Sequence, residues 1–162
     1  SEVMYENVMT KFKWRELDNP NSYYTTEDYK DKAVSVHRSY LNNLAETLIA
    51  ENKNEKARDV LLKSLEKMPD ESVPYDIYSA DMVRLLFEVD ESEKALEISE
   101  ALSTRADEEL SYLTKKGITN RDTYINLRIL DVLRNTMKAM GQTEEAQQLE
   151  EVFLQHYSLF QN

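Results

Sequence analysis

The segment LNNLAETLIAENKNEKARDVLLKSLEKMP, residues 41–69, decides how the rest of the chain can fold. Leucines recur every three or four positions in its first part and form the apolar face of one helix. Polar residues 52–54 interrupt this face, and a second apolar face runs from Ala57 to Leu65. Neither helix can bury its apolar face alone. The segment therefore predicts two antiparallel helices joined by a tight turn.

The order of small and large residues is more specific than that of a generic helical hairpin. Ala45 and Ala57 are small where two helices approach most closely, Leu61 is large, and Pro69 ends the unit because proline cannot continue a helix. This order follows the tetratricopeptide pattern of roughly 34 residues. It predicts an all-α fold, a tetratricopeptide-like superhelix of helical hairpins with about seven helices.

Three short segments, the first of them within residues 41–69, share one order of residues and mark the turns of three hairpins. They are Asn54-Glu55-Lys56-Ala57, Ser92-Glu93-Lys94-Ala95 and Thr143-Glu144-Glu145-Ala146. We expect the first residue of each to cap the following helix, the acid to complement the helix dipole, and the alanine to pack against the partner helix. The alanines are 38 and 51 positions apart, so the repeats are longer than the standard unit, and the last is the longest.

We predict one domain over residues 1–162. It consists of an amino-terminal cap helix and turn over 1–24 and helical hairpins over 25–69, 74–116 and 119–160. Thr25 and Thr26 precede two acids and are expected to start the first helix of the first hairpin.

The cap is predicted from apolar residues that fall on one face of a short helix. They are Met4, Tyr5, Val8, Met9 and Phe12. We expect this face to dock on the repeats, because a stack of hairpins needs its ends covered. Trp14, the only tryptophan, is expected to fill the junction below the cap.

Composition excludes several classes of partner and chemistry. The chain has 20 basic and 31 acidic residues, a net charge of −11, which repels nucleic acid and anionic lipid, so we expect neither as a partner. The absence of cysteine excludes disulfides, thiolate metal sites and thiol catalysis. No apolar run approaches the roughly 20 residues of a membrane span, so direct membrane insertion is not expected.

No catalytic, cofactor or metal motif stands out, and we predict a non-enzymatic domain. His37 and His156 are the only histidines, and neither belongs to a paired metal-ligand motif. Gly117 and Gly141, the only glycines, are too far apart to form a phosphate-binding loop. Runs of carboxylates such as Glu144-Glu145 are typical of solvated helix faces.

A superhelix of hairpins lines a concave groove with the first helix of each pair, and this groove is the predicted binding site for a protein or peptide. The candidate residues are Asn42, Glu46, Arg84, Glu88, Arg128, Asp131, Asn135 and Lys138. Among them, the cations can hold an anionic group. The alternative is that the cations pair with the neighbouring carboxylates as ordinary surface ion pairs. The Lys/Asn pattern with which chaperone-type repeats bind a terminal carboxylate is not matched.

Several stretches together suggest a particular family. They are MYENVMTKFKW (4–14), DNPNSYY (18–24), LAETLIAENKNEKA (44–57) and MPDESVPYD (68–76). Their order resembles the soluble carboxy-terminal region of large bacterial multi-pass membrane proteins similar to protein O-mannosyltransferases, and the likeness extends to about residue 102. The resemblance implies a non-catalytic accessory tail on the extracytoplasmic (periplasmic) side, tethered to the inner membrane, with its own membrane domain as a possible partner. It transfers no catalytic residue to this chain.

A glycan- or glycopeptide-binding module is the alternative function. Glycan sites present aromatic faces, and the candidate aromatics are Tyr23, Tyr24, Tyr75 and Tyr78. If Tyr75 and Tyr78 are buried between helices, they favour the protein-interaction hypothesis. If they are open along the groove, they favour the glycan hypothesis.

Overall fold

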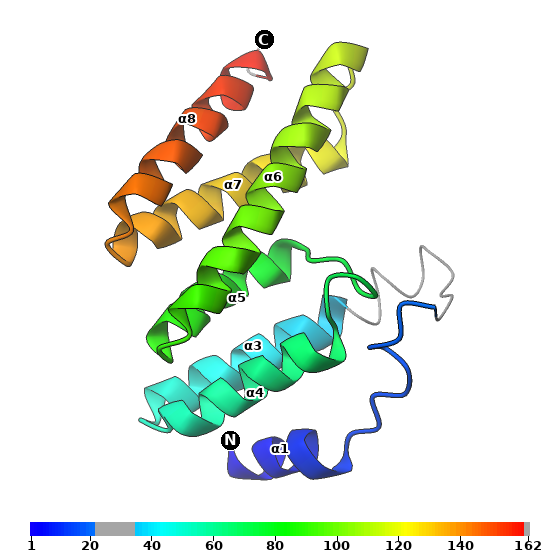
Figure 1. Cartoon of the computed structure of the whole chain (residues 1–162), viewed down its shortest axis with the longest axis vertical. Helices are drawn as coiled ribbons and strands as arrows, with labels where there is room; N and C mark the ends of the chain where they lie inside the picture. Colours follow the sequence, from blue (N-terminus) through cyan, green and yellow to red (C-terminus); the bar gives the residue numbers. More distant parts are fainter. Residues whose placement is uncertain (22–34, 161–162) are drawn as a thin grey trace.

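The computed structural model describes residues 1–21 and 35–160, and this part of the chain contains helices and no β-strand. Within it there are seven α-helices. They are α1 (Glu2–Glu6), α3 (Ser35–Ala50), α4 (Asn54–Lys67), α5 (Ile77–Glu88), α6 (Ser92–Lys116), α7 (Arg121–Ala139) and α8 (Thr143–Leu159). From α3 onward they pack in consecutive pairs (Figure 1). The predicted all-α class and number of helices are confirmed. The helix start expected at Thr25 and Thr26 lies outside the described residues.

The first helices of the three pairs form a layer, because α5 packs against both α3 and α7. The second helices α4, α6 and α8 lie nearer the viewer in Figure 1, where the long helix α6 crosses in front of α5 and α7. Of the helices in the described residues, none is both long enough and apolar enough to cross a bilayer.

The core follows the apolar faces expected from the sequence. Leu48 and Leu61 are fully buried between α3 and its neighbours, and so are the alanines Ala57 and Ala95. Small side chains at these two positions let the paired helices approach closely. Ala146, the corresponding residue of the third pair, is only half-buried, so packing is looser at this point.

The three hairpin turns share one backbone geometry. The residues Asn52, Asp90 and Gly141 follow the first helix of each pair and have positive φ angles of 59°, 64° and 75°. In each turn the next amide donates to the carbonyl five positions earlier. These bonds join Lys53 to Leu48, Glu91 to Leu86 and Gln142 to Met137 at 2.8, 2.9 and 2.9 Å. This is the Schellman motif. Asn, Asp and Gly adopt the left-handed conformation that the motif requires more readily than other residue types do.

The capping role predicted for Asn54, Ser92 and Thr143 is therefore wrong. These residues are the first of α4, α6 and α8, and none of the three helix starts has a side-chain cap hydrogen bond. The turn is fixed instead by the carboxy-terminal cap of the preceding helix. Each left-handed residue stands five positions before the packing alanine, which explains why the three turns look alike in the sequence.

The amino-terminal segment docks beside α4, as predicted, through α1 and the π-helical turn η1 (Asn7–Lys11). Val8 is buried, and Tyr5 donates its hydroxyl to Asp59 Oδ2 at 2.7 Å. Met4 and Phe12, expected on the same packed face, are each 42% exposed. The π-helical turn shifts the register of the face, so only part of it meets α4.

Arg38 fixes the linker between α4 and α5 to α3, and its role was not predicted. Its side chain is 1% exposed. Its guanidinium donates to the carbonyls of Met68, Val73 and Pro74 at 3.0, 2.5 and 2.8 Å. Asp76, the side-chain cap of α5, lies 3.5 Å from the same guanidinium. Arg38 thereby sets where α5 begins relative to α3.

Candidate functional site

The layer of α3, α5 and α7 contains a groove of about 200 Å³. It is lined by Ser39, Asn42, Asn43 and Glu46 from α3, Tyr78, Asp81, Arg84 and Leu85 from α5, and Val132 and Thr136 from α7. The groove thus lies on the first helices of the three pairs, where sequence reasoning placed the candidate residues. Three of those candidates, Asn42, Glu46 and Arg84, line it directly.

Arg84 at the rim of the groove is held by two carboxylates. Its guanidinium donates to Glu46 Oε1 at 2.6 Å across the α3–α5 contact and to Glu88 Oε1 at 2.5 Å one turn along α5. Burial works against the charged form of Arg84, but the hydrogen bonds to Glu88 and Glu46 outweigh it and raise the pKa of the guanidinium. Arg84 therefore joins α3 to α5 and has its charge compensated in place.

Asp81 lies one turn before Arg84 and was not predicted. The surrounding groove removes enough water from its carboxyl to raise the pKa above the usual value of an aspartate, although the positive charges of Arg128 and Arg84 oppose this shift. Asp81 is exposed at the groove surface, so it remains accessible to a ligand. Arg128 lies on α7, which also lines the groove through Val132 and Thr136.

Asn42 lies deep in the groove and is buried, although the sequence predicts the groove candidates to be exposed on its surface. Its side chain is held between α3 and α5, where Nδ2 donates to the carbonyl of Tyr78 at 2.8 Å. The residue is 6% exposed, and Oδ1 is buried without a hydrogen-bond partner among the described residues. The amide orientation follows from the contact with Tyr78, since a carbonyl can only accept a hydrogen bond.

The candidates on α7 are brought only partly into the groove. Arg128 is 65% exposed and lies 3.6 Å from Asp131, and Asn135 donates to Asp131 Oδ1 at 3.2 Å. Lys138 is exposed near the end of the helix. The side chains of α7 that do line the groove are Val132 and Thr136, one turn apart.

The two readings of the charged candidates can now be separated. The ion pairs of the alternative are present, because Arg84 pairs with Glu46 and Glu88, and Arg128 pairs with Asp131. The groove does not present a row of unpaired arginines to an anionic ligand. Sequence reasoning missed Asp81, Val132 and Thr136 because it aligned the units on their packing alanines. That alignment does not fix which side chains of α5 and α7 turn toward the groove once the helices pack.

The aromatic side chains of the glycan hypothesis are differently placed. Tyr75 is half-buried against the core, with the Arg38 guanidinium 5.6 Å from its ring centroid. Burial raises the pKa of its hydroxyl. Tyr78 is half-buried and lines the groove, whereas Tyr23 and Tyr24 lie outside the described residues. Only one of the four tyrosines therefore borders the groove in the part of the chain that the structure describes.

Acidic and histidine side chains within residues 1–21 and 35–160 form no group of three or more that could hold a metal ion. His37 is exposed on α3, and His156 is buried on α8, far from it in the sequence. Comparisons with known proteins identified no matching protein-family model, no similar curated protein and no similar solved structure.

Proposed function

We propose that this chain is a non-catalytic protein-interaction domain with a tetratricopeptide-like superhelix, and that it binds a peptide segment in the α3/α5/α7 groove. Three features support the architecture. The helices pack in consecutive pairs, the Schellman turn recurs before each packing alanine, and the first helices lie next to one another. Stacked hairpins of this kind expose an extended surface along their first helices.

The unpartnered Oδ1 of Asn42 is the observation that carries the proposal. A buried acceptor without a donor destabilises a protein by about 1–3 kcal/mol, and a ligand that supplies the donor recovers this free energy. Main-chain amides of a peptide supply such donors whatever its sequence. Asn42 therefore places an unpartnered acceptor just beneath the lining of the groove, where a backbone amide of a bound peptide would be favourable.

The charges of the groove indicate an uncharged, polar peptide. Arg84 is engaged by two carboxylates, and Asp81 and Asn43 leave an acceptor and an amide on the groove walls. An acidic peptide would have to displace Glu46 or Glu88 from Arg84. This is a revision of the expectation from the sequence, in which the cations favoured an acidic ligand.

The glycan-binding alternative remains a prediction. Tyr78 borders the groove, but Tyr75 already packs under Arg38. A single half-buried aromatic side chain offers less stacking surface than the row of tyrosines that the sequence suggested.

The wider setting of the domain is also part of the proposal. The family resemblance supports an accessory tail of a membrane glycosyltransferase-like protein, on the extracytoplasmic side of the inner membrane. In this setting the peptide is a loop of the membrane domain or of its substrate protein.

Selection from a random peptide library, followed by affinity measurement with fluorescence anisotropy, tests the proposed groove. For selected peptides, Asn42→Ala should weaken binding by roughly tenfold, because one buried hydrogen bond is worth about that factor. Asn135→Ala is the matched control, since it removes an amide from α7 outside the groove. Asn135→Ala should unfold like the parent. Asn42→Ala also loses the hydrogen bond to the Tyr78 carbonyl and should unfold at a lower temperature, so affinities are compared at a temperature where both variants are fully folded.

Unchanged affinity of Asn42→Ala for every selected peptide would contradict the peptide-binding proposal. A glycan array incubated in parallel distinguishes the alternative. The glycan module would be favoured if the library yields no binding peptide and the domain binds glycans with an affinity that Asn42→Ala weakens.

A further inference from the structure

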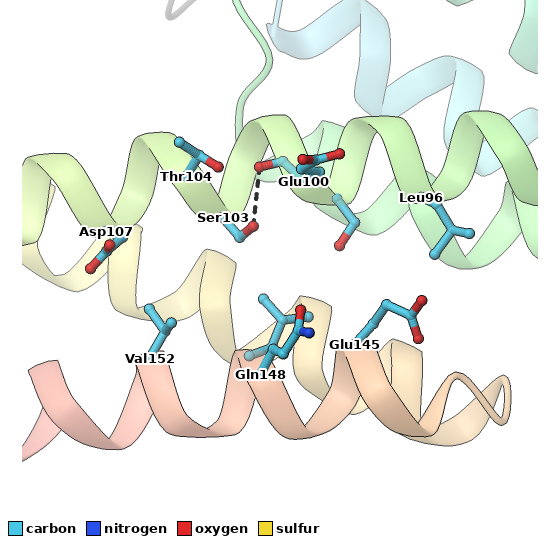
Figure 2. A pocket seen from close by; sticks show the side chains of 10 residues that line it. Leu96, Glu100, Ser103, Thr104, Asp107, Glu145, Gln148 and Val152 are labelled. Atoms are coloured by element: carbon cyan, nitrogen blue, oxygen red, sulfur yellow. Dashed lines mark hydrogen bonds between the residues drawn. The ribbon is translucent and has the colours of Figure 1, made fainter.

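A second groove, of about 430 Å³, lies between α6 and α8. Figure 2 shows that its side chains come from facing surfaces of the two helices, with Glu100 and Ser103 on α6 opposite Glu145 and Gln148 on α8. These helices are the second members of their pairs, so this groove is separate from the α3/α5/α7 groove. The two grooves share no lining residue.

The lining residues recur at helical spacing along both walls. On α6 they extend from Leu96 to Asp107, and on α8 from Glu145 to Val152. Leu96, Val152 and the buried Leu149 provide apolar surface. Each wall is about two to three helical turns long, or roughly 10–16 Å, at 1.5 Å per residue. This length suits a helical segment of a partner better than a small molecule.

Every charged side chain that lines the α6/α8 groove is acidic. Glu100 and Glu145 stand on opposite walls, and neither forms an ion pair with another described residue. The third carboxylate, Asp107, is hydrogen-bonded through Oδ1 to His156 Nε2 at 2.5 Å. This arrangement differs from the paired charges around Arg84, and it leaves two carboxylates available to cations of a ligand.

The contact between Asp107 and His156 links the two walls at one end of the groove. His156 is 1% exposed, and its ring joins α8 to α6 through Asp107. The imidazole therefore fixes how far apart the helices stand at that end.

We propose that the α6/α8 groove binds a basic amphipathic helix of another protein. Apolar side chains of that helix pack on Leu96, Leu149 and Val152, while its Lys or Arg side chains pair with Glu100 and Glu145. An amphipathic helix places such residues three and four positions apart, which matches the spacing of both walls. Charge complementarity predicts that the bound helix is positively charged, because the groove is acidic and the whole chain has a net charge of −11.

A second copy of this chain is a poorer occupant for the same reason. Two molecules of net charge −11 repel each other, and anionic lipid is repelled as well. The proposal is independent of the peptide-binding function assigned to the α3/α5/α7 groove.

A labelled synthetic helix with leucines on one face and lysines beside them is the probe, and its affinity is measured by fluorescence anisotropy at physiological salt. The double variant Glu100→Gln/Glu145→Gln should bind roughly tenfold more weakly than the parent. Glu109→Gln/Glu151→Gln is the matched control, because it makes the same change of net charge at exposed positions outside the groove on the same two helices. It should retain parental affinity to within about twofold, since distant exposed charges are screened.

A probe with glutamates in place of lysines should not bind. Methyl NMR shifts induced by the lysine probe should be centred on Leu96, Leu149 and Val152. Equal losses in both double variants, equal binding of the glutamate probe, or shifts centred on Val132 would each overturn the proposal. So would sedimentation equilibrium showing a dimer that the lysine probe dissociates, because the groove would then be occupied by a second copy.

Discussion

The grooves on the two sides of this molecule differ in how their charges are compensated. In the α3/α5/α7 groove, Arg84 binds Glu46 and Glu88 at 2.5–2.6 Å. In the α6/α8 groove, Glu100 and Glu145 have no ion-pair partner among the described residues. The first groove contains an unpartnered hydrogen-bond acceptor, Asn42 Oδ1, and one carboxylate, Asp81, whose charge is opposed by Arg128 and Arg84. The second contains unpaired carboxylates and no cation among the described residues that line it.

This difference predicts different ligands for the two surfaces. A groove whose cation, Arg84, is already paired gains little from an anionic ligand, since binding must break existing ion pairs, but it gains from a donor that reaches the buried acceptor. A groove with unpaired carboxylates gains from cations at long range as well as at contact. The number of charged residues is therefore a poorer guide to a site than their pairing.

Substitution of Arg38 should separate the two grooves most strongly. Arg38→Ala removes a buried cation from three carbonyls and Asp76, and it leaves these acceptors without their donor. We expect a loss of about 3–5 kcal/mol in the free energy of unfolding, measured by urea denaturation. Because Arg38 fixes α5 to α3, the variant should lose more affinity for a peptide in the α3/α5/α7 groove than for a helix in the α6/α8 groove.

Arg105→Ala provides the matched control for Arg38→Ala. Arg105 binds Asp70 in the same linker at 2.7 Å, but its side chain is 46% exposed. Its removal should lower the free energy of unfolding by less than about 1 kcal/mol. Similar losses for the two arginine variants would contradict the special role assigned to Arg38.

Leucine substitution of the packing alanines should distinguish the fully buried alanines from the half-buried one. Ala57→Leu and Ala95→Leu insert bulk into fully buried positions and should each destabilise the fold by about 1–3 kcal/mol. Ala146→Leu enters a half-buried position on α8 and should cost less than about 1 kcal/mol. Urea denaturation of the three single variants measures these differences. A loss at Ala146 as large as that at Ala57 would show that the third pair packs as closely as the first.

The sequence predicted the helices and their pairing because apolar periodicity is a local property. The faces containing Leu48 and Leu61 could be read from spacing alone, and Gly117, with φ 63°, ends α6 where the first helix breaker stands. The turns were located correctly but explained wrongly. The left-handed Asn52 and Asp90 are a signal that glycine-based rules for helix ends do not detect.

The site was less predictable because it depends on angles around helices and on distant contacts. The burial of Asn42 follows from α5 packing over α3, and the role of Arg38 follows from carbonyls about 30 or more positions away. The α6/α8 groove had no signal in the sequence, because Glu145 was interpreted as part of a solvated face. Whether a carboxylate is paired is decided by the tertiary structure.

The covered surface of α4 provides an internal comparison for the open groove between α6 and α8. There the amino-terminal segment is already docked, and Glu2 lies 2.7 Å from Lys53 and also pairs with Lys56. Tyr5 bonds to Asp59, and Lys56 lies 5.2 Å from the Tyr5 ring centroid. Apolar packing flanked by opposite charges is the same combination that we propose for the ligand of the α6/α8 groove.

Docking of this segment should therefore depend on pH. We expect its release to change stability less than the arginine and alanine substitutions do. Hydrogen bonds from Lys53 and Lys56 lower the pKa of Glu2 from 4.5 to about 2, so its contribution is present above pH 4.5 and is lost as the pH falls toward 2. The hydrogen bond to Asp59 raises the pKa of Tyr5 from 10.0 to about 12, so that contribution is present below pH 10 and is lost as the pH rises toward 12.

Fluorescence of Trp14, whose ring centroid lies 5.8 Å from that of Phe12, should report release of the segment at both extremes of pH. Tyr5→Phe should weaken the alkaline transition and preserve the acidic one. Glu2→Gln should weaken the acidic transition, to which Asp18 beside Lys67 and Glu51 beside Ser1 also contribute. If neither variant changes either transition, Glu2 and Tyr5 do not hold the segment through their charged contacts, and charge pairs would then be a weak guide to what binds between α6 and α8.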